Sequence, residues 1–274
     1  MFYRILILLL LPVCFYDASF AQLVKQDDDE LRKISVEEHL GEVVLLELVF
    51  LNSRGDTVAL GDFFRRGLPV LLSLYYTNCP MLCSLLLTGL AKGVRGMELT
   101  PGEDFQMLSI SFDPRETPES AAAVKARYEG MLKPDIPPDG WEFLISPDDQ
   151  TRILAQTLGF NYFYIEERDE YAHPAVVFIL TDSGGISRYL YGIEFNPRDL
   201  RLSLVEASQG KIGTTVDRIL LYCFHYDPEA KGYVAMAGNI MKLGGLVSML
   251  LLGAFLTILW GRDRISKNRK AKAS

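Results

Sequence analysis

The feature that most constrains the fold is a nearly continuous apolar run, Pro69–Tyr76, that leads directly into two closely spaced cysteines. A run without alternating polar residues is typical of a strand that is buried on both faces of a sheet. The next segment, Pro80–Val94, has a helical pattern, with Asn78 as its candidate N-cap. The sequence therefore predicts a buried strand followed at once by a helix, with Cys79 and Cys83 at the junction.

The rest of the chain continues this alternation of strands and helices. Strands are predicted at Val43–Phe50, Phe105–Phe112, Val176–Leu180 and Ile186–Tyr191, and helices at Pro118–Leu132, Asp148–Leu158 and Arg198–Ser208. The last two strands flank a Gly-rich turn of the hairpin type. Strand, helix, strand, helix and then two strands around a tight turn is the thioredoxin-like order. We therefore expect an α/β, thioredoxin-like fold with a central sheet covered by helices.

Both ends of the chain differ in composition from a soluble domain. Residues 1–21 contain an early basic residue, an apolar run and small residues at the end, which is the layout of a signal peptide. Residues 243–260 carry no charge and could cross ~30 Å of hydrocarbon. A basic cluster follows, as is typical of the cytoplasmic side of a membrane. The sequence thus predicts a single-pass protein of the cytoplasmic (inner) membrane, with its main domain on the periplasmic or extracytoplasmic side and its C-terminus in the cytoplasm.

These observations divide the chain into consecutive segments. They are a signal peptide (1–21), a flexible acid-rich lead (22–40), a thioredoxin-like domain (41–210), a juxtamembrane segment (211–235), a C-terminal transmembrane helix (236–260) and a basic cytoplasmic tail (261–274). The chain has a net charge of −7; the tail after Trp260 contributes +5 and residues 1–21 contribute zero, so residues 22–260 carry −12. Because phosphate binding needs clustered Lys and Arg, this charge argues against a nucleic-acid partner.

Cysteine is scarce, and Cys79 and Cys83 follow a buried strand, where a thioredoxin-like fold keeps its active site. Residues four apart on a helix share a face, so two thiols there can bind one metal ion, act as a redox pair or close a structural disulfide. A helix N-terminus also lowers the pKa of a cysteine. Two thiolates are soft ligands that suit Cu(I). His173, in a loop before the strand Val176–Leu180, would face them with an imidazole, although a lone histidine is usually structural.

The segment Thr77–Cys83, TNCPMLC, resembles the T-x-C-P-x-x-C signature of the SCO/SenC family of copper chaperones, which serve cytochrome c oxidase assembly. The segment Asp113–Pro118, DPRETP, is similar to the family's D-P-x-R-D-T-P segment, shortened by a residue and with Glu116 as the acid. His173, before an apolar strand and a Gly turn, matches the family's ligand histidine. The resemblance covers about residues 40–195 and implies a thioredoxin fold that binds copper, as Cu(I) or Cu(II), through these two thiolates and one imidazole.

Two features depart from the family pattern. The family commonly places its membrane anchor at the N-terminus, whereas the apolar span here lies near the C-terminus. Pro174 also follows the histidine directly. Thioredoxin folds often have a cis-proline near this point, and a cis bond before Pro174 would add redox character to the site.

Two other groups of residues have alternative interpretations. Asp113 and Glu116 follow a buried strand at the edge where α/β folds place ligands. They would hydrogen-bond near the copper, orient a partner, or simply cap the helix that begins at Pro118. Cys223 and His225 could bind metal or pass copper to a membrane partner, or they could belong to an aromatic-rich segment without such a role.

Three functions are compatible with this sequence. The first is a copper-binding protein that delivers copper to, or prepares, the copper site of a cytochrome c oxidase, with the copper-site subunit of that terminal oxidase as its partner. The second is a thiol–disulfide oxidoreductase in which Cys79 and Cys83 are the catalytic redox pair. The third is a partner-binding or sensing domain. Thioredoxin-like reductases normally have two residues between their cysteines; the three found here favour the first function.

Overall fold

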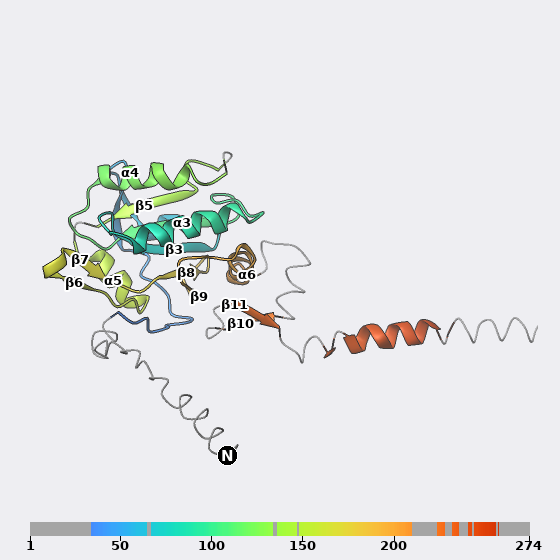
Figure 1. Cartoon of the computed structure of the whole chain (residues 1–274). Helices are drawn as coiled ribbons and strands as arrows, with labels where there is room; N and C mark the ends of the chain where they lie inside the picture. Colours follow the sequence, from blue (N-terminus) through green and yellow to red (C-terminus); the bar gives the residue numbers. More distant parts are fainter. Residues whose placement is uncertain are drawn as a thin grey trace, which may run out of the picture.

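The computed structural model describes residues 34–64, 67–133, 136–146, 148–209, 224–227, 232–235, 241–242, 244–255 and 257. Its strands are β1 (Val49–Asn52), β2 (Thr57–Ala59), β3 (Val70–Tyr75), β4 (Gln106–Ser111), β5 (Trp141–Ile145), β6 (Phe163–Ile165), β7 (Glu170–Ala172), β8 (Val176–Leu180), β9 (Ile186–Tyr191), β10 (Phe224–Asp227) and β11 (Gly232–Ala235). Its helices are η2 (Leu60–Phe63), α3 (Leu82–Arg95), α4 (Pro118–Glu129), α5 (Gln150–Thr157), η3 (Glu166–Arg168) and α6 (Pro197–Ala207). A 7-stranded sheet with the order β2-β1-β5-β4-β3-β8-β9 is the centre of the fold (Figure 1).

The strands β4, β3, β8 and β9 form the thioredoxin-like part of the sheet. β3 and β4 are parallel and are joined by α3, whereas β8 is antiparallel to β3 and forms a hairpin with β9. α6 follows β9, and α3 contacts both α4 and α6, so these three helices cover the same face of the sheet. This arrangement confirms the predicted α/β, thioredoxin-like fold.

Burial explains why the sequence around β3 is so apolar. Every residue of β3, β4 and β8 is buried. Two buried serines in these strands satisfy each other, because the hydroxyl groups of Ser73 and Ser109 lie 2.7 Å apart, and Trp141 in β5 donates from Nε1 to Ser109 Oγ at 2.9 Å. A buried hydroxyl without a partner would cost about 1–3 kcal/mol, so these bonds allow the three strands to lie inside the core.

Two parts of the strand arrangement differ from the sequence-based expectation. The strand predicted at Val43–Phe50 begins only at Val49, and Val43 makes an isolated bridge to Gly185. Residues before β1 instead accept hydrogen bonds from η2, for example at Leu46 O and Leu48 O. β5 and the β6–β7 hairpin were absent from the prediction, since their short, polar-interrupted sequences carry a weak periodic signal.

The predicted C-terminal transmembrane helix, 236–260, is wrong. Within the part of the chain that the structure describes, no helix is both long and apolar enough to cross a bilayer. The expected membrane contact through this helix is therefore without support.

Other predicted segments lie outside the described residues. These are the signal peptide (1–21), the greater part of the lead (22–40) and the basic tail (261–274). Of the predicted juxtamembrane segment (211–235), the structure describes β10 and β11, which pair antiparallel.

Gly89 lies where α3 packs against the chain that follows β9. A Cβ atom added at Gly89 would lie 1.9 Å from the carbonyl oxygen of Ile193, so one backbone must move. We expect Gly89→Ala to lower the free energy of unfolding by about 3 kcal/mol through overpacking. Gly130→Ala is the matched control, because its added Cβ would meet no atom closer than 3.5 Å, and its effect should stay within about 1 kcal/mol. Chemical denaturation measures both, and equal stabilities would contradict the close packing of α3.

Candidate metal centre

Three loops meet at one edge of the sheet. β3 ends at Tyr75 and β4 ends at Ser111, so the loops that follow these parallel strands lie at the same edge. β8 runs antiparallel to β3, with Ser73 opposite Val177, so the loop that precedes β8 lies there too. The first loop carries the cysteines, the second an acidic turn and the third His173.

The side chains of Cys79, Cys83 and His173 converge at this edge. Their potential ligand atoms all lie within 4.8 Å of one another, and Cys83 Sγ is 3.4 Å from His173 Nε2. Among the described residues this is the one group of three cysteine, histidine or acidic side chains close enough to hold a metal ion. Two sulfurs and an imidazole nitrogen are a soft to borderline donor set, which suits copper. The structure thus brings together the three predicted ligand residues, and their binding of copper stays a prediction.

Cys79 lies in the loop before α3, and its sulfur accepts a hydrogen bond from the backbone N–H of Cys83 at 3.1 Å. α3 begins at Leu82 with Met81 as its N-cap, later than predicted, so the two cysteines do not share a helical face. Met81 provides no side-chain cap, and the Cys79 sulfur satisfies one of the N–H groups that a helix start leaves open. The hydrogen bond from the Cys83 thiol, together with the backbone N–H groups, lowers the pKa of Cys79 to about 3.

Cys83 has the opposite environment. It lies in the first turn of α3 and is only 2% exposed. Burial, and then the neighbouring Cys79 sulfur, raise the pKa of the Cys83 thiol well above its ordinary value. Without metal, the site therefore holds one thiolate and one protonated thiol at neutral pH.

His173 is held in an aromatic pocket. Its ring lies 5.3 to 6.1 Å from the ring centroids of Phe112, Tyr76 and Phe160. Nδ1 lies 3.0 Å from the carbonyl oxygen of Pro174, which can only accept, so Nδ1 carries the proton and Nε2 faces Cys83 with its lone pair. The described residues contain no cis peptide bond, so the suggested cis bond before Pro174 is wrong.

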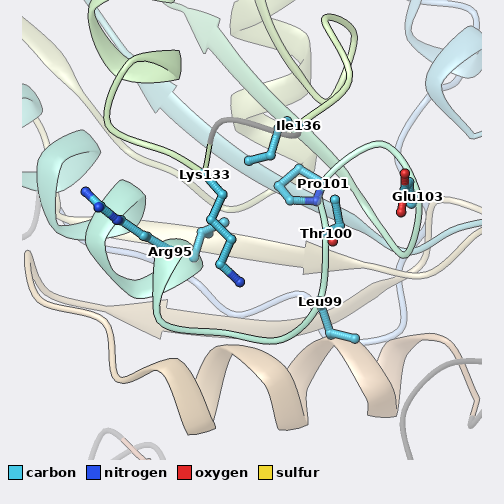
Figure 2. Close-up of a pocket in the computed structure, with 8 residues that line it drawn as sticks. Arg95, Leu99, Thr100, Pro101, Glu103, Lys133 and Ile136 are labelled. Carbon is cyan, nitrogen blue, oxygen red and sulfur yellow. The ribbon is translucent and has the colours of Figure 1, made fainter.

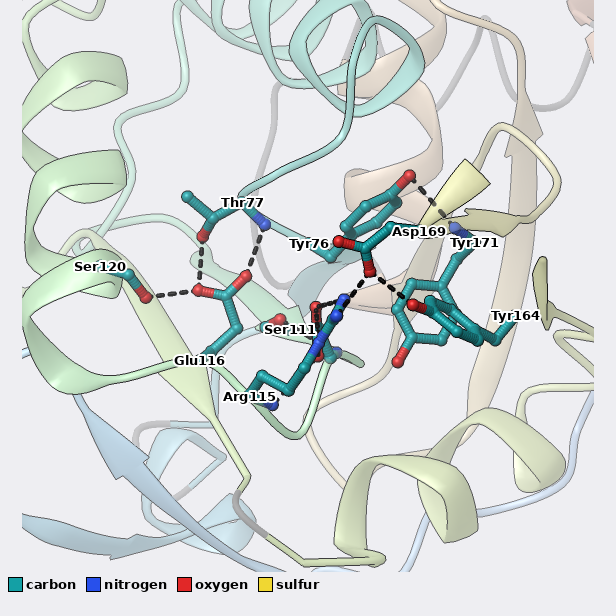
Figure 3. Close-up of polar contacts among 10 residues, drawn as sticks. Tyr76, Thr77, Ser111, Arg115, Glu116, Ser120, Tyr164, Asp169 and Tyr171 are labelled. Atoms are coloured by element: carbon teal, nitrogen blue, oxygen red, sulfur yellow. Dashed lines mark hydrogen bonds and ion pairs between the residues drawn. The ribbon is translucent and has the colours of Figure 1, made fainter. Parts of the chain in front are cut away.

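The acidic turn after β4 holds the cysteine loop in place. Glu116 accepts two hydrogen bonds from Thr77, one from its backbone N–H and one from its hydroxyl, both at 2.6 Å (Figure 3). Ser120 donates to the same carboxylate. Thr77 is two residues before Cys79, so Glu116 fixes the entry of the chain into the metal centre. The helix cap suggested for Glu116 is instead made by Thr117, which accepts from Ser120 N.

The same turn also reaches the segment that carries the histidine. Arg115 binds the buried carboxylate of Asp113 through Nε and Nη2, and its Nη1 lies 2.6 Å from Asp169. Asp169 also accepts from Tyr164, and the Arg115 guanidinium lies over the Tyr164 ring (Figure 3). Asp169 precedes β7, which ends directly before His173. We call Arg115 and Asp169, with Glu116 and Thr77, the clamp, since they tie both sides of the site to one turn.

The sequence motif predicted only part of the clamp. It indicated Glu116, and Asp113, which Arg115 binds, but it gave no role to Arg115 or Asp169. Arg115 belongs to the same motif and could have been found there, but no local pattern links it to Asp169, which is 54 positions away. Cys223 lies outside the described residues, and of His225 only the backbone, in β10, is described. Their suggested metal site stays a prediction.

Two cavities at opposite edges of the sheet differ in the metal ligands that line them. One, of about 270 Å³, lies between α3 and α4 and is lined in part by Cys83 and by Tyr75. The buried hydroxyl of Tyr75 has no hydrogen-bond partner among the described residues. The other, of about 180 Å³, lies at the opposite edge, where β4 begins (Figure 2). Arg95, Lys133 and Glu103 line the second cavity, which offers neither thiol nor imidazole. Only the first adjoins a ligand suited to a soft metal.

Comparison with known proteins agrees with this fold. A protein of Aquifex aeolicus VF5, provisionally named as an electron transfer protein, is 26% identical, with a TM-score of 0.56 over 63% of this chain and 96% of that chain. Arabidopsis thaliana ScoI with copper bound is 18% identical, with a TM-score of 0.49 over 62% of this chain and 98% of that chain. BsSco, described as a member of the Sco family of cytochrome c oxidase assembly proteins with a disulfide switch, is 21% identical, with a TM-score of 0.48 over 65% and 99%. No curated protein sequence matches the chain.

Fold and site together define a thioredoxin-like protein with a two-cysteine, one-histidine group able to bind a metal. The SCO1/SenC family profile matches residues 38–207, and the chain belongs to this family.

The low pKa of Cys79 predicts an unusual pH profile for its alkylation. Iodoacetamide reacts with the thiolate, so the Cys79 rate in the reduced full chain should be nearly constant from about pH 5 to 8, whereas an unfolded cysteine slows as the pH falls below ~8.5. Cys83→Ala removes the largest cause of the low pKa, so the rate should then fall with decreasing pH. Peptide mapping by mass spectrometry distinguishes Cys79 from the other thiols. An identical profile in the variant would contradict this account.

The clamp predicts that Asp169→Asn weakens the site although Asp169 is not a candidate ligand. Loss of the ion pair with Arg115 should loosen the segment before His173 and lower Cu(I) affinity by about 10- to 100-fold, as is typical for residues that orient ligands. Competition with a Cu(I) chelator measures the change. Asp149→Asn is the matched control, because it breaks an exposed ion pair with Arg152. Equal affinities in the two variants would show that the clamp does not position the site.

Proposed function

We propose that this protein binds one copper ion through Cys79, Cys83 and His173 and delivers it to, or prepares, the copper site of a cytochrome c oxidase. The observation that carries the proposal is the convergence of two sulfurs and an imidazole nitrogen within 4.8 Å, in a chain of the SCO1/SenC family. Copper is here the cargo of the protein. Its relative ScoI has been described with copper bound, and BsSco belongs to the assembly proteins of cytochrome c oxidase.

The chemistry of the donor set supports copper in particular. Two thiolates favour Cu(I), and the imidazole nitrogen adds a ligand that Cu(II) also accepts. The aromatic rings around His173 and the burial of Cys83 keep water from two of the three donors. The exposed side of Cys79 leaves a path for the ion to enter and leave. A site that is buried on one side and open on the other suits transfer to a partner.

One observation also favours the second candidate, a thiol–disulfide oxidoreductase that prepares oxidase cysteines. Cys79 and Cys83 are free, adjacent and unequal, with a low pKa at the partly exposed Cys79 and a raised pKa at the buried Cys83. Such a pair can form a disulfide and undergo exchange with a partner thiol. The copper-site subunit of the oxidase would be the partner in both cases.

Metal binding by the reduced full chain separates these functions. We expect one copper per chain, with tight binding abolished by Cys79→Ser or Cys83→Ser and weakened by His173→Ala, because two remaining ligands cannot hold a soft ion against competing thiols. With Cu(II), a sulfur-to-copper charge-transfer band should appear and should vanish in either cysteine variant. Elemental analysis and absorption spectroscopy measure these results.

Cys223→Ser serves as the control and should bind copper like the natural chain. A copper content near zero with fully reduced thiols would refute the copper-binding function. Efficient turnover of protein disulfides with weak copper binding would instead identify the oxidoreductase. Full copper affinity in His173→Ala would remove the histidine from the ligand set.

A further inference from the structure

Met81, which lies between the two cysteines, has an exposed side chain. Its relative exposure is 65%, although methionine is more often found in protein cores. It is the N-cap of α3, and its backbone N–H is a hydrogen-bond donor to the Cys79 sulfur. The methionine side chain is therefore attached next to the candidate metal centre, and solvent surrounds much of it.

The position of Met81 matches the open side of the site. Cys83 and His173 are 2% and 6% exposed, so Cys79, which is partly exposed, is the most accessible of the three donors. Met81 is bound to this donor through its backbone N–H, and its own side chain is exposed to solvent. A thioether is a soft, neutral donor that favours Cu(I), and the flexible methionine side chain can adjust its position to an ion.

We propose that the Met81 thioether is a weak fourth ligand that binds Cu(I) on the solvent side of the site and speeds its exchange with a partner. This inference rests on the proposed copper function and extends it. A thioether binds without releasing a proton, and it binds less strongly than a thiolate. It can therefore take part in the exchange of ligands while the two cysteines and His173 still hold the ion.

An apolar docking role is the main alternative for Met81. Leu85, one turn later on α3, is also exposed, at 42%, so Met81 could belong to a surface that merely contacts a partner. Met81→Leu separates these roles, because it keeps an apolar side chain of similar volume and removes the sulfur. Met97→Leu is the matched control, since Met97 is 3% exposed and lies beyond the far end of α3.

The test uses the full chain labelled with selenomethionine and loaded with one Cu(I). X-ray absorption at the copper edge should show a Cu–Se distance in the natural chain and in Met97→Leu, and none in Met81→Leu. Transfer of Cu(I) to a chelator in excess should slow about tenfold in Met81→Leu and stay unchanged in Met97→Leu. Thermal unfolding of the metal-free variants checks that both remain folded.

The outcomes distinguish this inference from the proposed function. Absence of Cu–Se scattering in the copper-loaded natural chain, or unchanged transfer by Met81→Leu, would overturn the role of Met81 and leave copper binding by the other three residues intact. Failure of the natural chain to bind Cu(I) at all would overturn both. Loss of the Cu–Se signal together with slower transfer in Met81→Leu alone supports the inference.

Discussion

The antiparallel pairing of β8 with β3 determines where every part of the metal centre lies. This pairing places the loop before β8 beside the loop after β3. Cys83 Sγ and His173 Nε2 therefore lie 3.4 Å apart, although the two residues are 90 positions apart in the chain. The parallel pairing of β3 with β4 adds the acidic turn at the same edge. Both pairings lie in fully buried strands, so the ends of these strands, from which the three loops extend, are held by the core.

The parts of this arrangement that arise from local sequence could be predicted. Continuous apolar residues indicated β3, and the cysteines directly after it indicated the site. His173 followed from the expected fold. The strand at β5 could not be predicted, because it depends on pairing partners that are distant in the chain. The same reason explains why the contact between Arg115 and Asp169 was missed. The β6–β7 hairpin was missed because its two strands are short and carry a weak periodic signal.

The sequence also predicted the ends of helices poorly, for physical reasons. Asn78 is a good N-cap by residue type, yet α3 starts at Leu82, because the Cys79 sulfur accepts the N–H of Cys83. A thiolate is not among the usual capping groups, so sequence rules gave no sign of it. At the C-terminus, an uncharged composition predicted a membrane helix, whereas no helix among the described residues is both long and apolar enough to cross a bilayer.

The hydrogen bond between His173 and the carbonyl oxygen of Pro174 has a consequence for the proton balance of metal uptake. Because Nδ1 keeps its proton for this bond, the nitrogen that faces the sulfurs has none to lose in the neutral ring. Cys79, with a pKa of about 3, is already ionised at neutral pH. Arrival of a metal ion would then displace a single proton, from Cys83, and its departure would return that proton to the same buried sulfur. Acidification would accordingly promote release by returning a proton to the buried Cys83 sulfur, whereas the Cys79 thiolate, with its low pKa, would keep its charge.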